Sequence, residues 1–157
     1  MKNIQLRNKL FILSSVIFAA CTNEIAFGPK PQRMIFDQGD LRVITTSINP
    51  KSKSMSVLYG NDRAYTAALS GSGHHVAGER YTYLTWNYIE NPRWFGSNIS
   101  KDLLSEESIA VEGDGEEGSL KFHYKVENGD PLPVNGIRMN PQDRIAYIFE
   151  YRPSVLP

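Results

Sequence analysis

Cysteine is the scarcest chemically reactive residue in this sequence: Cys21 is the only one among 157 residues. A single thiol excludes an internal disulfide, a CxxC redox pair, a zinc site built on several thiolates and covalent attachment of a c-type haem. Net charge is lacking too, because 17 basic side chains balance 17 acidic ones. Three of the basic residues lie in the first twenty positions, so the rest of the chain has a net charge of −3. A mildly acidic body argues against a nucleic-acid partner.

Long hydrophobic runs are also missing. The apolar stretch at residues 10–20 has 11 residues, whereas about 20 are needed to span the hydrocarbon core of a bilayer. It follows the basic residues Lys2, Arg7 and Lys9, with no acidic residue among them. A positive segment followed by a short apolar run is typical of a secretory signal.

The apolar run ends in Phe18-Ala19-Ala20-Cys21, which resembles the lipobox of bacterial lipoproteins. That resemblance implies cleavage before Cys21, a diacylglyceryl thioether on its thiol and a fatty acyl chain, such as palmitate, on the new amino group. Thr22, in place of an aspartate, favours the outer membrane, facing the periplasm. A soluble secreted protein or an uncleaved anchor is the alternative. The expected organisation is a signal peptide at 1–20, a lipidated tether at 21–34 and a folded domain at 35–157.

The remaining chain has the composition of a folded protein, with 41% hydrophobic and 22% charged residues overall. β-Branched or alternating apolar residues predict strands at 42–48, 54–59, 80–89, 108–111, 119–127 and 144–151. Asn61 is a suitable N-cap for an alanine-rich helix at 61–69, and a helical turn capped by Ser100 is expected within 100–107. Without βαβ spacing, this order predicts a single α+β domain: an antiparallel sheet of about five strands with one or two packed helices.

Two groups of polar residues have the composition of metal sites. His74, His75 and Glu79 lie in a glycine-bounded loop, where no helix makes them converge, and His123 is expected on the solvent face of its strand. Acidic residues at 112–118 lack the residue order of a calcium loop and are typical of a solvated hairpin tip. We therefore expect no metal ligands here. No nucleophile elbow or phosphate-binding glycine loop is present either, so no catalytic residue is assigned.

Aromatic residues crowd the segment 81–95. They can line an apolar pocket or fill the core of the sheet. We expect the filled core, made by Trp86, Tyr88, Trp94 and Phe95.

Four segments of the chain share a pattern: SMSVLYGND at 54–62, AGERYTYLTW at 77–86, ENPRWFG at 90–96 and RIAYIFEYRPSVLP at 144–157. Together they resemble bacterial envelope proteins of the cytochrome P-460 family, in a branch without the haem attachment motif. The resemblance covers residues 40–157 and implies an antiparallel sheet with packed helices, often in a homodimer. The family's haem chemistry depends on a CxxCH near the C-terminus. Residues 149–157 contain neither Cys nor His, so that chemistry does not carry over.

Three functions remain open. The first is a non-enzymatic envelope module, without a cofactor, that binds a small ligand or a partner protein. The second is a protein with non-covalent haem held by His74, His75 or His123, with redox or nitrogen-oxide-related activity. The third is an enzyme with dispersed residues, for which convergence of His75, Glu79, Arg80 and Trp94 in one cleft would be the first support.

Overall fold

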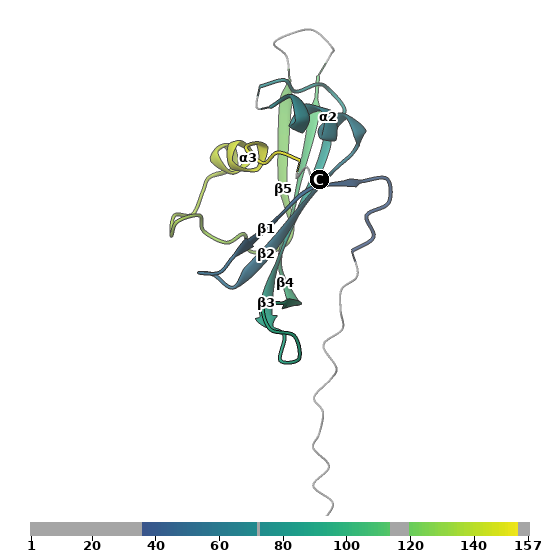
Figure 1. The fold of residues 1–157 in the computed structure, drawn as a ribbon. Helices are drawn as coiled ribbons and strands as arrows, with labels where there is room; N and C mark the ends of the chain where they lie inside the picture. The colour runs from purple at the N-terminus through teal and green to yellow at the C-terminus, as the bar shows by residue number, and fades with distance from the viewer. Residues whose placement is uncertain (1–35, 72, 114–119, 154–157) are drawn as a thin grey trace, which may run out of the picture. The chain divides into compact units, whose positions relative to one another are not determined.

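Five antiparallel strands form one sheet, in which the strands follow one another in sequence order, as the computed structural model shows (Figure 1). The structure describes residues 36–71, 73–113 and 120–153. The strands are β1 (Arg42–Asn49), β2 (Ser54–Gly60), β3 (Arg80–Glu90), β4 (Asn98–Glu112) and β5 (Lys121–Gly129). With two helices packed on the sheet, this is the single α+β domain that the sequence predicts.

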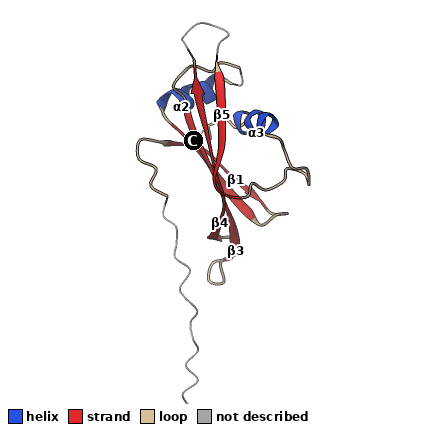
Figure 2. Cartoon of the chain, turned by 180° about the vertical axis from the view of Figure 1, so that it is seen from behind, coloured by secondary structure: helices blue, strands red, loops and turns tan. Residues whose placement is uncertain are grey.

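The two described helices are α2 (Asp62–Ser70) and α3 (Pro141–Phe149) (Figure 2). The Asn61 side chain accepts a hydrogen bond from the amide of Ala64 at the start of α2, as predicted, and Gly71 ends this helix with φ +92°. Each helix has nine residues, and neither is long and apolar enough to cross a membrane.

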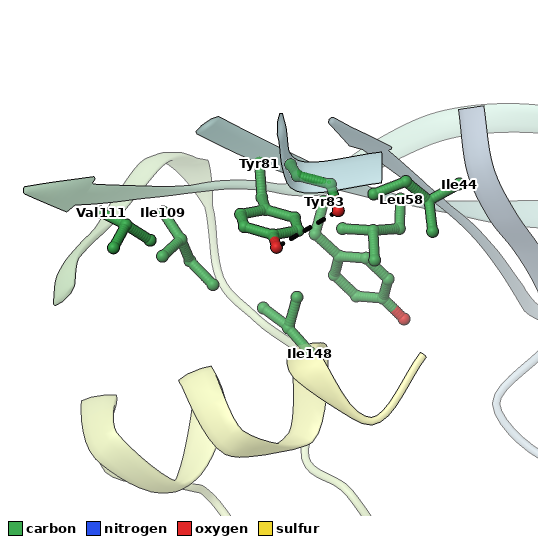
Figure 3. Packing of buried hydrophobic residues seen from close by; sticks show 8 residues of the cluster. Ile44, Leu58, Tyr81, Tyr83, Ile109, Val111 and Ile148 are labelled. Carbon is green, nitrogen blue, oxygen red and sulfur yellow. Dashed lines mark hydrogen bonds between the residues drawn. The ribbon is translucent and has the colours of Figure 1, made fainter. Parts of the chain in front are cut away.

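The core lies between one face of the sheet and the two helices. Figure 3 shows Ile148 of α3 directed at side chains of the sheet, among them Tyr81 and Ile109. Ala64 of α2 belongs to the same buried cluster. Both helices therefore bury side chains against one continuous apolar surface. The buried members are Ile44, Leu58, Ala64, Tyr81, Tyr83, Ile109, Val111 and Ile148.

The aromatic residues expected to fill the core do not do so. Trp94 is 70% exposed and Phe95 is fully exposed, while Trp86 and Tyr88 are only partly buried. Tyr81 and Tyr83 take the core positions instead. Tyr81 and Tyr83 are two residues apart on β3, so both side chains lie on the face of the sheet that packs against the helices. Trp94 and Phe95 lie beyond the end of this strand, in the β3–β4 turn.

Two further predictions were wrong in element type. The helical turn predicted at 100–107 is strand instead. Together with the strand correctly predicted at 108–111, these residues form the single strand β4, which pairs with β3 along most of its length. The strand predicted at 144–151 is largely the helix α3. Asn140 caps that helix by accepting the amide of Asp143 at 2.9 Å, and Pro141 lies in its first turn. This cap and proline fix a helix start where alternation suggested a strand.

Candidate functional site

A polar pocket of about 310 Å³ opens between the β1–β2 hairpin, the sheet and α3. Ser54, Ser56 and Thr85 contribute hydroxyl groups from the sheet, and Arg144, Tyr147 and Tyr151 line it from α3 and the residues that follow. The segment 132–135 forms another part of the wall. We call this cavity the hydroxyl pocket.

Three tyrosine hydroxyls are linked in the wall of the hydroxyl pocket. The Tyr151 hydroxyl lies 3.2 Å from that of Tyr83 and 2.7 Å from that of Tyr147. Burial first, and then the hydrogen bond to Tyr151, raises the pKa of Tyr147 to about 12. Burial also raises the pKa of Tyr83 above its ordinary value, with Tyr151 adding to the effect. Tyr83 and Tyr147 are therefore neutral at physiological pH. A phenol hydroxyl can both donate and accept a hydrogen bond.

Serine and threonine hydroxyls in the pocket pair with one another. Ser56 Oγ lies 3.0 Å from Thr85 Oγ1 on the neighbouring strand, and Ser54 Oγ lies 2.7 Å from Ser52 Oγ. A nucleophilic serine needs a hydrogen bond to a general base such as an imidazole. The Ser56 hydroxyl pairs with a second hydroxyl, which is not a general base.

A buried ion pair supports the pocket. Nε and Nη2 of Arg144 each lie 2.7 Å from an oxygen of the Glu107 carboxylate, whose residue is 1% exposed. The Tyr124 hydroxyl donates to the same carboxylate at 2.7 Å. Although burial alone would lower the pKa of Arg144, the hydrogen bonds and charge of Glu107 raise it above its ordinary value. The guanidinium of Arg144 therefore stays charged, and the Glu107 carboxylate balances that charge beside the pocket.

A second buried carboxylate holds a histidine near the far end of the core. Glu79 is fully buried, and its Oε2 lies 2.7 Å from His75 Nδ1 and accepts the Tyr81 hydroxyl at 2.9 Å. Its Oε1 accepts the Val76 amide at 2.5 Å. The His75 ring stacks on Phe149 with centroids 4.0 Å apart. His75 and Glu79 thus connect the 74–79 loop to the sheet and to α3.

The proposed cleft of dispersed enzyme residues does not form. His75 and Glu79 do meet, but the Arg80 guanidinium pairs with Asp40 at the surface, at 2.5 Å. Arg80 begins β3 and Trp94 lies beyond its other end. The strand length therefore separates these two residues.

The other candidate ligands are at the surface. His74 is exposed, and His123 lies on the solvent side as predicted, 3.1 Å from Glu112. Within residues 36–71, 73–113 and 120–153, no three His, Cys, Asp or Glu residues are grouped as metal ligands. Most of the acidic segment at 112–118, and Cys21, lie outside the described residues.

The fit of a haem can be tested at His75. Its Nδ1 is held by a carboxylate, as is typical of ligand histidines. However, the ring is packed between Phe149, Phe122 and Tyr81, and His75 lines neither the hydroxyl pocket nor the other pockets beside α2 and α3. The carboxylate-held imidazole suits a haem, but among the described residues these three rings occupy the space beside it that a porphyrin would need.

The residues of the hydroxyl pocket were not identified from the sequence. Tyr147 and Tyr151 were assigned to a strand, and Arg144 and Glu107 are 37 positions apart. One signal was available: Glu107 lies two positions before the alternating apolar residues Ile109 and Val111 of β4, at a position where a buried charge would need a partner.

Comparison with known proteins adds no relative from which a function could be transferred: no family model and no curated protein sequence matches the chain.

Proposed function

We propose that this chain is a lipid-anchored envelope protein whose α+β domain binds a small, uncharged, hydroxyl-rich molecule, such as a saccharide, in the hydroxyl pocket. The observation that carries the proposal is the lining of that pocket by linked hydroxyl groups from β2, β3 and the α3 region.

The size and charge of the pocket support this ligand class. A volume of about 310 Å³ lies at the lower end of the range for small-molecule sites. Arg144 is the charged residue in its lining, and Glu107 already balances that charge. An anionic ligand would have to compete with a buried carboxylate, whereas a neutral ligand would leave the ion pair intact.

The hydrogen-bonding capacity of the lining also favours a neutral, hydroxyl-rich ligand. A hydroxyl group offers one donor and two acceptor sites, so one bond to a neighbouring hydroxyl leaves further capacity for a ligand. Sugar hydroxyls have the same dual character. The tyrosine rings add apolar surface on which a sugar ring can pack.

Anchoring of the domain rests on the sequence. The lipobox-like segment ending in Cys21 supports attachment to the inner leaflet of the outer membrane, with the domain in the periplasm. In that compartment a binding domain on a short tether would meet small solutes that have crossed the outer membrane.

The test is a thermal-shift titration of the purified protein with neutral mono- and disaccharides, alongside citrate and inorganic phosphate as charged probes. Neutral saccharides should raise the melting temperature by mass action, and the charged probes should not. Tyr147→Phe should weaken saccharide binding by about two- to thirteenfold, which corresponds to one neutral hydrogen bond of about 0.5–1.5 kcal/mol.

Tyr65→Phe is the matched control, because it removes a phenol hydroxyl from α2, outside the pocket. It should leave saccharide binding unchanged. The proposal would be wrong if only citrate or phosphate bound, if both variants behaved alike, or if the protein purified with a Soret band from bound haem.

A further inference from the structure

The hairpin of β3 and β4 extends beyond the rest of the sheet as a two-stranded arm (Figures 1 and 2). Pairing of β2 with β3 ends at Ser54 and Asn87, and pairing of β4 with β5 ends at Ser105 and Gly129. Beyond those points β3 and β4 continue to pair with each other, as far as Glu90 and Asn98. We call residues 89–99 the arm and residues 91–97 its tip.

Hydrogen bonds within the tip fix its conformation. The Asn91 amide donates to the Ser97 carbonyl oxygen at 2.9 Å, and the Ser97 amide and hydroxyl donate to the Trp94 carbonyl oxygen at 3.2 and 3.1 Å. The Arg93 amide donates to the Asn91 side chain at 3.0 Å. Gly96 has φ +79°, a value that favours glycine, and closes the turn.

This hydrogen-bonded turn exposes two large aromatic side chains to solvent. Trp94 is 70% exposed, Phe95 is fully exposed, and Ile89 at the base of the arm is 50% exposed. None of the three belongs to the buried core cluster. Packing of the domain therefore gives no reason for an aromatic pair at the end of a projecting hairpin, and such exposed apolar groups are typical of contact surfaces.

We propose that the tip inserts Trp94 and Phe95 into the headgroup region of the bilayer to which Cys21 is attached. This inference rests on the lipid anchor in the proposed function. A stable protein interface buries about 800 Å² on each partner, and a single projecting turn offers much less. A bilayer interface, by contrast, accepts a convex tip, and tryptophan is enriched at that depth.

The anchor brings the tip within reach of the bilayer. Fifteen residues, 21–35, connect Cys21 to the described part of the domain, and they can span at most about 50 Å when extended. A tether of this length holds the domain at a high effective concentration beside the lipid surface. Two aromatic side chains then suffice to favour one orientation, although they would bind a bilayer weakly on their own.

The charges of the arm predict how its binding depends on salt. Glu90 and Arg93 are its charged residues, so the arm has no formal net charge. Adsorption driven by anionic lipids would weaken with salt, because exposed charges are screened. Insertion of the aromatic pair should be nearly insensitive to salt.

The chain offers a direct spectroscopic test, because Trp86 and Trp94 are its only tryptophans. The full acylated protein is reconstituted in phosphatidylethanolamine–phosphatidylglycerol vesicles, with and without brominated acyl chains. In the Trp86→Phe variant, which reports Trp94 alone, emission should shift to the blue and be strongly quenched at both low and high salt. In the matched Trp94→Phe variant, which reports the half-buried Trp86, quenching should be slight.

If Trp86→Phe impairs folding, the difference between the unaltered protein and Trp94→Phe gives the same measurement. Absence of quenching at Trp94 would overturn the proposal. So would a blue shift without quenching, which would indicate a protein partner or a second copy over the tip, and equal quenching of both tryptophans, which would indicate adsorption of the whole domain.

Failure of the anchor or of the ligand site would be recognised separately. Flotation of the protein with vesicles reports acylation, and the saccharide thermal shift reports the hydroxyl pocket. If the protein does not float, the anchor has failed. An excess of vesicles then takes the place of the tether, and quenching of Trp94 would support insertion of the tip independently of the anchor.

Discussion

At the scale of single residues, the pair of Glu107 and Arg144 attaches α3 to the sheet. Both residues are buried, and two 2.7 Å hydrogen bonds join them. Glu107→Gln removes the negative charge and leaves the guanidinium buried without a counter-charge. We expect it to lower the free energy of unfolding by about 3–5 kcal/mol, measured by urea denaturation.

Replacing both members of the pair provides the control. The double variant Glu107→Leu/Arg144→Met removes both buried charges together, so it should recover much of the stability that either single change loses. Asp130→Asn, in the exposed pair of Asp130 with Arg138, should have no measurable effect. Additive losses from the two single changes at 107 and 144 would contradict the coupling.

The linked tyrosines predict a loss of stability at alkaline pH. Burial, with the hydrogen bond to Tyr151, raises the pKa of Tyr147 to about 12, from 10.0 for an unperturbed phenol. A pKa raised in the folded state means that the stabilisation is complete below pH 10 and is lost as the pH rises to about 12. Urea midpoints measured across that range should fall, and Tyr147→Phe should reduce the fall. An equal fall in both proteins would show that Tyr147 makes no contribution.

At the scale of elements, β4 was predicted incompletely because a buried charge obscures its pattern. In β4 the positions facing the helices run Ser105, Glu107, Ile109 and Val111, so two of the four are polar and obscure the alternation. Glu107 is tolerated inside because Arg144 neutralises it, and that partner is invisible in the local sequence. The strands β1 and β2 and the helix α2 were predicted correctly, because the β-branched or alternating residues and the cap residue that specify them lie within each segment.

The end of β5 depends on a glycine for two separate reasons. Gly129 has φ +71°, and a Cβ atom there would overlap the carbonyl oxygen of Leu104, a backbone atom that also accepts the Asp130 amide at 3.0 Å. Gly136 has a similar φ of +81° but open space around it. Gly136→Ala should therefore cost about 1–2 kcal/mol, from backbone strain alone. Gly129→Ala should cost clearly more in urea denaturation, and equal losses would show that the Leu104 contact is unimportant.

At the scale of the whole molecule, the sequence predicts the α+β class, because alternation and caps are local properties. It does not predict the hydroxyl pocket, because Ser56, Thr85 and Tyr151 come from three distant segments. It also assigned Trp94 and Phe95 to the core, since composition alone does not distinguish an aromatic core from an aromatic tip. Attachment to the membrane stays a prediction from the segment that ends in Cys21.

That attachment can be tested with Cys21→Ala. The substitution removes the thiol that would carry the diacylglyceryl group, so the protein should lose incorporated palmitate and no longer sediment with the membrane fraction. The expected effect is large, because each buried CH₂ group contributes about 0.8 kcal/mol and several acyl chains act together. Residue 21 lies outside the described domain, so the saccharide thermal shift should be unchanged, which controls for folding. Unchanged palmitate labelling and membrane sedimentation in Cys21→Ala would rule out acylation of Cys21 as the anchor and would favour the alternative of an uncleaved N-terminal anchor.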